Sequence, residues 1–494
     1  MRIRLVPTSS GKKAVQVVSK LHGKLTVHKH FGSYSGESEK LLLVKQAKDF
    51  ILASSRQISL LELVDSPKLN DIEITNSQPL FVYRFLGNIY DKLGLNAFAD
   101  PLIKDLVVAR IFSPVSKLET LETLADSFNR RYSLKTVYRH LKSSLEKGVK
   151  EAFQAALINF AQTDLKDTLR LVFYDVTTLY FESVVKQGLR NFGFSKDHKN
   201  TTTQIVVGLV VNNQGFPLYF DIFNGSTFEG HTFLPIIKNI QTLLHNPELV
   251  IIADAAMLSQ SNINNLVNRK IGFVVGARLA NLPHELIDAI SNQIGNQDGK
   301  IAVFEYKNQR LICQYSHSRA AKDKSDRLKQ IEKAKLALKA PAKITSKFRF
   351  LKTDQADLTL NSKLISKVEK LEGIKGYLTN TQLPENIIID RYHDLWHIEN
   401  SFKITKSDLA ARPIFHRLDD TIKTHLVIVF ASLAITKYVE IYSKLSIKKV
   451  LKIAGKLLTH SVINTQTGEN KLLETVIKDP NLIEKINLLK SLEH

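Results

Sequence analysis

Two stretches of β-forming apolar residues run directly into an aspartate, and this pattern limits the folds open to the chain. The run at 171–178 reads LVFYDVTT and carries Asp175, and the run at 249–254 reads LVIIAD and ends on Asp254. Apolar runs without polar alternation predict strands that are buried on both faces. A carboxylate on such a strand is costly to bury unless a cation or hydrogen-bond donor meets it. Either aspartate alone could equally be a helix cap or a turn residue.

The elements expected around these runs follow the order strand, strand, strand, helix, strand, helix, strand. That is the order of an RNase H-like α/β core, so the sequence predicts this fold class with both aspartates at strand ends. Periodicity and turn residues place the remaining elements as strands at 204–211, 216–223 and 271–276 and helices at 232–244 and 259–268.

A third motif lies further along the chain, from Tyr392 to Lys406. On a regular helix a step of seven residues falls about 20° short of two turns, so Tyr392, Glu399 and Lys406 would share one face. A neighbouring apolar seam would press this helix onto a core. An ordinary amphipathic helix with surface charges explains the stretch as well when it is taken alone. The seam consists of Leu395, Ile398, Phe402 and Leu409.

Two strand-end aspartates and a glutamate on a later helix suit phosphoryl transfer by two metal ions. Hard divalent cations prefer oxygen ligands, and a pair about 3.5–4 Å apart can activate an attacking hydroxyl and stabilise the leaving oxygen. We therefore expect Asp175, Asp254 and Glu399 to be the catalytic metal ligands.

With these motifs in this order, the chain resembles bacterial insertion-sequence transposases of the DDE type, in the group with a Tyr-Arg-Glu-Lys signature. The resemblance rests on YDVTT at 174–178, IADAAM at 252–257 and the spacing of Tyr392, Glu399 and Lys406. Further segments that look like this family are GFSKD at 193–197, 204–208 and Arg412-Pro413.

The resemblance implies a mechanism, a cofactor and partners. It implies binding to the terminal inverted repeats of double-stranded DNA, strand cleavage by water with two Mg²⁺ ions (Mn²⁺ can substitute), and attack of the freed 3′-OH on target DNA. It also implies a homodimer assembled on two DNA ends, with Tyr392 and Lys406 gripping phosphates. Lys196 falls in a matched segment but has no role that its chemistry assigns.

Two departures from the family pattern concern DNA contacts. Leu395 stands where the signature has arginine, so a nearby basic residue such as Lys403 would have to replace it. Some relatives hold a flipped base with a tryptophan in the insertion, whereas the single tryptophan here, Trp396, lies in the signature stretch. Any stacking would then fall to aromatic residues of the insertion. These are Phe304, Tyr306 and Tyr315.

The charge of the chain points to a polyanionic partner. The formal net charge is +21 and the positive residues are spread along all 494 residues, although a basic protein without a nucleic-acid role is the alternative. A possible helix-turn-helix with its second helix capped by Ser133 would offer Lys135 and Arg139 to a major groove. A basic helix at 316–338 would offer Arg319, Lys322 and Arg327 to the DNA backbone. A helix pair that never touches DNA is the alternative for the first, and a solvated charged helix is the less favoured alternative for the second.

Four regions are expected from these patterns. They are a β-hairpin and helix region at 1–78, a helical region at 79–165, the catalytic core at 166–425 with an insertion at about 277–372, and a helical region at 426–494. The hairpin is expected to turn at His22-Gly23.

The class of protein expected is a cytoplasmic, nucleoid-associated DNA transposase. One cysteine and no zinc-like spacing fit a reducing compartment. The longest apolar segment, around 426–435, is too short to span a bilayer, so no membrane is expected. A catalytically inactive DNA-binding protein and a nuclease without strand transfer remain the alternatives.

Overall fold

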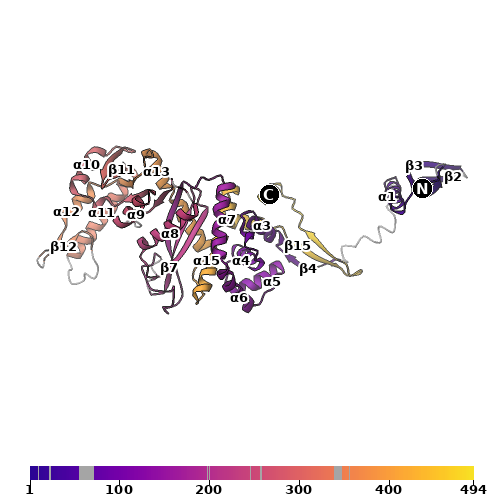
Figure 1. The fold of residues 1–494 in the computed structure, drawn as a ribbon, viewed down its shortest axis with the longest axis horizontal. Helices are drawn as coiled ribbons and strands as arrows, with labels where there is room; N and C mark the ends of the chain where they lie inside the picture. Colours follow the sequence, from indigo (N-terminus) through magenta and orange to yellow (C-terminus); the bar gives the residue numbers. More distant parts are fainter. Residues whose placement is uncertain are drawn as a thin grey trace. The chain divides into compact units, whose positions relative to one another are not determined.

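The computed structural model describes residues 1–494 except 9–10, 22–23, 55–71, 197–198, 200, 245, 247, 256–258, 339–347, 355–356 and 494. The predicted turn His22-Gly23 and the motif residues Asp197, Ala256 and Met257 therefore lie outside the described residues. The chain divides into two compact units (Figure 1). The smaller comprises Met1–Ser77 and His460–Leu473, and the larger Gln78–Thr459 and Glu474–His494.

The smaller unit begins with an antiparallel sheet covered by one helix. The pairing of the second and third strands confirms the predicted N-terminal hairpin, and the helix packs on all three strands. A small core of Val15, Val17, Tyr34 and Ala47 holds these elements together. The elements are β1 (Arg2–Pro7), β2 (Lys13–Leu21), β3 (Lys24–Tyr34) and α1 (Glu37–Ser54).

A second small sheet joins residues from both ends of the chain. Its order is β16-β15-β4, and Thr75 donates a side-chain hydrogen bond of 3.1 Å to the carbonyl of Ser461. The prediction that residues 426–494 are helical is therefore wrong for β15 and β16. The alternation of apolar and polar residues in that segment is too short and too polar to predict a strand before its partner strand is known. The strands are β4 (Ile72–Gln78), β15 (Thr459–Asn464) and β16 (Asn470–Glu474).

The larger unit is built on an eight-stranded sheet of order β10-β11-β14-β9-β8-β5-β6-β7. Strands β5, β8 and β9 pair in parallel, and β6 pairs antiparallel to both β5 and β7. The five strands β7-β6-β5-β8-β9 have the order and directions of an RNase H-like core, which confirms the predicted fold class. Their bounds are β5 (Leu171–Tyr180), β6 (Gln204–Val211), β7 (Pro217–Asn224), β8 (Val250–Ala253) and β9 (Gly272–Ala277).

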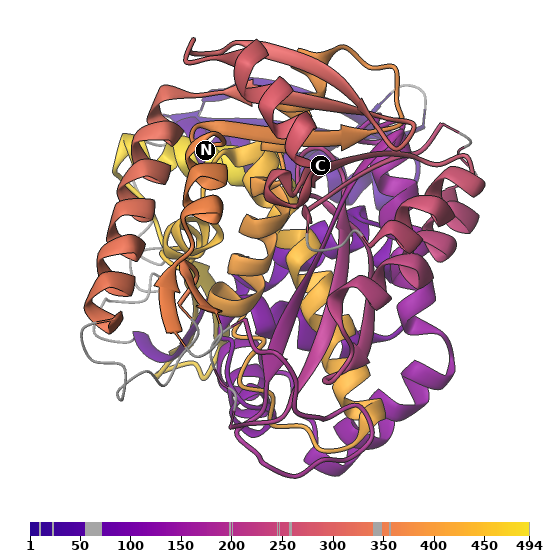
Figure 2. The ribbon, with the colours of Figure 1, turned by 90° about the vertical axis from the view of Figure 1, so that its left-hand side faces the viewer.

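Helices cover both faces of this sheet (Figure 2). Helix α8 packs on β6 and β7, α9 packs on β9, and α14 and α15 pack on β5, β6 and β7. Because side chains alternate along a strand, Tyr174 points to α8, where its hydroxyl bonds Thr232 at 2.6 Å. Asp175 therefore points to the α14 face. The helices are α8 (Glu229–Leu244), α9 (Gln260–Asn268), α13 (Glu385–His393), α14 (Trp396–Lys403) and α15 (Asp419–Ser443).

The predicted insertion extends the sheet, and does not form a separate layer. Its hairpin β10–β11 pairs through β14, which is antiparallel to β9 and thus lies inside the sheet. The predicted basic helix is confirmed as α11. The elements between β9 and α13 are α10 (His284–Ile294), β10 (Ile301–Tyr306), β11 (Gln309–Tyr315), α11 (His317–Leu338), β12 (Leu351–Asp354), β13 (Asp357–Leu360), α12 (Ser362–Glu369) and β14 (Ile374–Thr379).

A helical layer precedes the sheet and is completed by helices from the C-terminal part of the chain. Helix α15 packs against α4, α6 and α7, so the expected boundary between residues 425 and 426 falls inside one helix. The predicted cap at Ser133 is confirmed, since its hydroxyl accepts from the amide of Thr136 at 3.2 Å. The helices are α3 (Leu80–Lys92), α4 (Pro101–Phe112), α5 (Lys117–Phe128), α6 (Leu134–Glu146), α7 (Val149–Thr163), α16 (Ile447–Ala454) and α17 (Pro480–Ser491).

Helix α15 is longer than the apolar segment seen in the sequence. Its 25 residues are enough, by length and composition, to cross a membrane, but 83% of its apolar window is buried inside the fold. That burial is the pattern of a core helix.

Candidate active site

The strand register brings the two predicted aspartates together. In the parallel pair β5–β8, Tyr174 stands opposite Ala253. Asp175 and Asp254 are the next residues on the two strands, so their backbones are neighbours at the same end of the sheet. Asp254 follows the last residue of the four-residue β8, whereas Asp175 lies in the middle of the ten-residue β5 and stands opposite Leu209 of β6. The prediction that both aspartates stand at strand ends is therefore wrong for Asp175, because β5 continues along β6 after its pairing with β8 ends.

Asp175 is a largely buried carboxylate with one cationic neighbour. Its Oδ1 accepts from its own neighbour's amide, Val176 N, at 2.7 Å and lies 3.7 Å from Lys196 Nζ. Burial raises the pKa of Asp175 to about 6, the Lys196 ammonium and the Val176 N–H oppose this rise, and Glu229 and Asp254 add to it. The carboxylate is therefore held close to two other acids.

Lys196 is the shared cation of this acid cluster. Its ammonium donates to the Val176 carbonyl at 2.7 Å and lies 3.2 Å from Glu229 Oε1. One ammonium thus serves both Asp175 and Glu229, which gives a structural role to a residue that the sequence matched without assigning a function. Glu229, the first residue of α8, was missed, because an acid in the first turn of a helix is a common feature.

The signature stretch is not one regular helix. It consists of α13, the linking residues Asp394 and Leu395, and α14, followed by a π-helical turn at Ile404–Asp408 that carries Lys406. The expected single stripe of Tyr392, Glu399 and Lys406 is therefore wrong, because the break and the π turn change the angular step between them.

Tyr392 contacts a carboxylate of the cluster instead of open solvent. Its side chain is only 7% exposed, and its hydroxyl donates to Asp254 Oδ1 at 3.3 Å. Burial and the charge of Asp254 raise the pKa of Tyr392, so the phenol stays protonated and can donate. In this structure the Tyr392 hydroxyl thus orients Asp254, and its contact with a DNA phosphate stays a prediction.

Gly276 of β9 makes room for this phenol. A Cβ atom placed on Gly276 would lie 2.5 Å from the Tyr392 hydroxyl oxygen and 3.3 Å from Ala255 Cβ. Real Cβ atoms do not approach an oxygen so closely, so a side chain here would displace the phenol. The glycine thus permits the Tyr392–Asp254 hydrogen bond.

Lys375 of β14 supplies a positive charge that the sequence reasoning missed. Its ammonium lies 4.6 Å from the centroid of the Tyr392 ring. Burial and the nearby Arg319 lower the pKa of Lys375, while Asp254 and Glu399 raise it, so the amine lies within electrostatic reach of both acids. Its only sequence signal was a lysine inside an otherwise apolar strand, IKGYLT.

The residue at the expected arginine position packs into the core. Leu395 is 9% exposed and belongs to the main apolar core. The structure thus places a cation beside Tyr392 from another element, β14, whereas the predicted substitute, Lys403, is an exposed residue near the end of α14.

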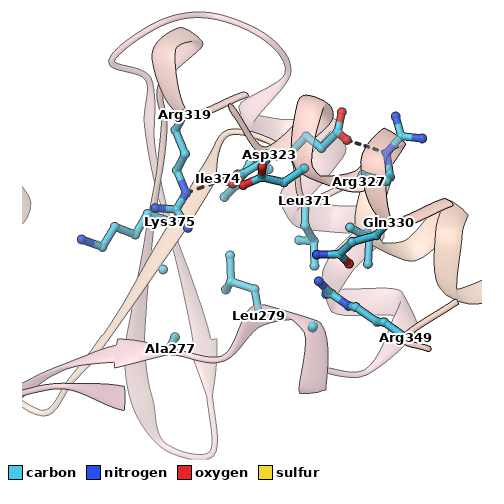
Figure 3. Close-up of a pocket in the computed structure, with 15 residues that line it drawn as sticks. Ala277, Leu279, Arg319, Asp323, Arg327, Gln330, Arg349, Leu371, Ile374 and Lys375 are labelled. Atoms are coloured by element: carbon cyan, nitrogen blue, oxygen red, sulfur yellow. Dashed lines mark hydrogen bonds and ion pairs between the residues drawn. The ribbon is translucent and has the colours of Figure 1, made fainter. Parts of the chain in front are cut away.

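A polar cavity of about 340 Å³ lies between α11, β14 and the segment 277–280, with Lys375 and Arg319 on one side of it (Figure 3). Arg327 also lines it, but its guanidinium is buried and pairs with Glu369 at 2.9 Å and with Glu372 at 2.5 Å. Two carboxylates therefore already neutralise the charge of Arg327, and the DNA contact expected of it stays a prediction. Arg319 forms a 3.4 Å ion pair with Asp323 and is partly exposed.

The remaining predicted DNA-contacting residues lie on exposed parts of two helices. Lys135 and Arg139 are exposed on α6, the second helix of the predicted helix-turn-helix, and Lys322 is exposed on α11.

The carboxylates have the chemistry of a site for hard divalent cations, and their geometry is only partly assembled. The carboxylates of Asp175, Asp254 and Glu229 lie near one another and offer oxygen ligands. The charge of Glu399, like that of Asp254, raises the pKa of Tyr392 and of Lys375. Among the residues that the structure describes, no three Asp, Glu, His or Cys side chains converge closely enough to hold one ion. The ammonium of Lys196 stands between two of the acids.

Comparison with known proteins supports one family. Residues 167–435, more than half of the chain, match the family model described as Transposase DDE domain. No curated protein matches the chain. Among solved structures, a cryo-EM structure of a piggyBac transposase synaptic complex with hairpin DNA is similar over 79% of this chain and 81% of that chain, with 9% identity and a TM-score of 0.40.

Proposed function

The chain belongs to the family of transposases with a DDE domain, and we propose that it binds the ends of an insertion sequence, cleaves DNA strands by metal-dependent hydrolysis and joins the 3′-OH to target DNA. The observation that carries this proposal is the parallel register of β5 and β8, which sets Asp175 beside Asp254. Carboxylates on adjacent strands are what phosphoryl transfer by divalent cations requires.

Two Mg²⁺ ions, for which Mn²⁺ could substitute, would be held by Asp175, Asp254 and Glu399. When bound, such ions lower the pKa of an attacking water or hydroxyl and stabilise the leaving oxygen. The protein's own groups prepare the carboxylates: Lys196 neutralises part of the charge of Asp175 and Glu229, and the Tyr392 hydroxyl fixes the orientation of Asp254. Such supporting residues tune ligand affinity.

Lys375 would take the place of the missing signature arginine. Its ammonium faces the Tyr392 ring and lies within reach of Asp254 and Glu399, so a scissile phosphate brought to the acids would gain a cationic contact from β14. An ammonium binds phosphate as a point charge, without the fork geometry of arginine. This weakens the alternative of a catalytically inactive protein, for which Leu395 was the only hint.

DNA would be held along basic surfaces of several elements. We assign backbone contacts to Arg319 and Lys322 of α11 and to Lys403 and Lys406 near α14, and groove contacts to Lys135 and Arg139 of α6. The net charge of +21 supports such contacts. A homodimer would assemble on two DNA ends, in the cytoplasm and on the nucleoid.

The test is cleavage of a DNA fragment that carries the sequences flanking this reading frame. Asp175→Asn is expected to reduce nicking in Mg²⁺ at least about a thousandfold while binding of the fragment is retained. Asp221→Asn is the matched control: Asp221 is a half-buried carboxylate of the same sheet that pairs with Lys150 at 2.6 Å, outside the acid cluster.

The outcomes separate the functional classes. Parental nicking by the Asp175 variant would refute the assignment of the metal ligands. Cleavage without joined products in a strand-transfer assay would favour a nuclease, and binding without cleavage in Mg²⁺ or Mn²⁺ would favour a binding-only protein.

A further inference from the structure

A second cavity, of about 600 Å³, lies among helices α4, α5 and α6 and the segment that follows the signature helix. The N-terminal turn of α5 and the loop at 410–416 form part of its wall. Its polar lining residues are Arg110, Ser116, Lys117, Glu119, Tyr138, Arg412, His416 and His425.

Four basic side chains of this lining are more than nine-tenths buried. Arg110 is 5% exposed, Lys117 7%, His416 8% and His425 4%. They come from four places in the chain: α4, the first residue of α5, the loop after the signature helix, and α15. We call these four residues the cation pocket.

The cation pocket has no counter-charge among the described residues. Neither Arg110 nor Lys117 forms a hydrogen bond or ion pair with any described residue. The one acid in the described lining, Glu119, accepts from the Ser116 amide at 3.1 Å in the capping box of α5 and is exposed. Burying a charge without a partner is costly, so this arrangement is poorly satisfied by the protein alone.

The pKa values of the four side chains agree with their burial beside other basic groups. Burial lowers the pKa of Arg110 to about 10, and burial and Arg110 together lower the pKa of Lys117. Burial, Lys117 and Arg110 lower the pKa of His416 to about 3. Burial, Arg110, His416 and Lys117 lower that of His425. Desolvation and repulsion between the basic groups therefore lower these pKa values, and no acid opposes them.

One further feature favours an anion. The first turn of α5, a helix of twelve residues, lines the cavity with Lys117, Leu118 and Glu119, and a helix N-terminus attracts negative charge. The lowered pKa values keep the two imidazoles neutral, and His425 Nε2 donates to the Ala411 carbonyl at 3.4 Å, so its buried Nδ1 is an acceptor. The positive charge that an anion would meet is therefore that of Arg110 and Lys117.

We propose that the cation pocket binds a phosphoryl group, which is either a backbone phosphate of bound DNA or a free phosphate. Guanidinium and ammonium groups are the usual partners of phosphate oxygens in proteins. This site is separate from the acid cluster, and the proposal goes beyond the proposed reaction because it requires no cleavage.

Thermal unfolding of the full chain tests the site with inorganic phosphate as the probe, at constant ionic strength adjusted with sodium chloride. We expect 10 mM phosphate to raise the Tm of the parent by about 2 °C. Lys117→Met and Arg110→Met should each weaken the phosphate affinity at least about tenfold and so abolish the rise. Lys142→Met is the matched control: it removes a positive charge from the exposed face of α6, where Lys142 pairs with Glu146, and should keep the rise.

A second readout separates a ligand site from a structural one. Without phosphate, Lys117→Met should be at least as stable as the parent, because it removes an unpaired buried charge. If Lys117→Met strongly destabilises the protein in phosphate-free buffer, the lysine holds the fold together and the proposal is wrong. It is also wrong if all variants respond to phosphate as the parent does.

Competition distinguishes the two sources of phosphate. If the pocket takes a DNA phosphate, 10 mM phosphate should weaken binding of a duplex fragment, and both Met variants should bind DNA at least about tenfold more weakly than Lys142→Met does. If it takes a free phosphate, DNA binding should be the same in parent and variants while the Tm response differs. An absence of both the Tm response and the DNA effect would overturn the proposal. Neither assay measures cleavage, so the result does not depend on the proposed catalysis.

Discussion

The acid cluster around Asp175 and the cation pocket around Arg110 bury charge in opposite ways. In the acid cluster, Lys196 stands between Asp175 and Glu229, and Tyr392 donates to Asp254, so much of the negative charge is met inside the protein. In the cation pocket, Arg110 and Lys117 repel each other, and no described acid forms an ion pair with either. The first site is therefore stabilised by partners within the protein, whereas the second requires an external ligand to balance its charge.

The largest effect is expected from removing the buried charge of Asp175. Because its pKa is raised from 3.8 to about 6, the folded protein keeps a proton in that range that the unfolded chain has lost, so stability falls as the pH rises from 4 to 6. Above pH 6 the cost reaches about 3 kcal/mol. In EDTA, Asp175→Asn should therefore be more stable than the parent at pH 7.5 and equal to it near pH 4, as measured by urea unfolding. Equal stability at both pH values would mean that the internal partners satisfy Asp175 fully.

Substitution of Lys375 tests whether the acid cluster needs a cation from β14 to cleave DNA. Lys375→Ala should slow DNA cleavage about a hundredfold, since a charged hydrogen bond to a phosphate in the reacting state is lost, while DNA affinity changes only a few-fold. Lys375→Arg should retain most of the rate. Lys370→Ala, which removes an exposed lysine paired with Asp288, is the control. Parental cleavage by Lys375→Ala would exclude Lys375 as a substitute for the signature arginine.

Replacing lysine by methionine should have different effects on the free energy of unfolding in the two clusters. Lys196→Met leaves Asp175 and Glu229 without their shared cation and should lower the free energy of unfolding by about 2 kcal/mol. Lys117→Met removes an unpaired cation and should not lower it. Urea unfolding of both variants in phosphate-free buffer at pH 7.5 provides the measurement. A loss of stability in both variants would remove the distinction between the two sites.

The sequence predicts those parts of the fold that depend on local pattern. Apolar runs identified β5 and β8, the order of elements identified the RNase H-like core, and Ser133 marked the start of α6. These features depend on residues close together in the chain, so periodicity and capping chemistry reveal them.

Contacts between distant segments could not be predicted in the same way. The sequence predicts a DNA contact for Arg327, because no residue near it in the chain reveals its ion pairs with Glu369 and Glu372. The helix break after Asp394 and the π turn at Lys406 depend on packing, which overrides the regular helical step. The cation pocket joins α4 and α5 to residues some three hundred positions later, and only tertiary structure brings them together.

The smallest effect concerns the contact that completes the acid cluster, at Gly276. A Cβ there would crowd the Tyr392 hydroxyl, so Gly276→Ala should displace the phenol from Asp254 and slow cleavage about tenfold, the range for removing a supporting hydrogen bond of a metal ligand. Tyr392→Phe should slow cleavage to a similar extent, because it removes the same hydrogen bond. In the Tyr392→Phe background the alanine no longer meets a hydroxyl, so the two changes together should cost little more than either alone. Fully additive losses in cleavage rate would show that Gly276 acts through β9 itself, and that Asp254 is oriented without the phenol.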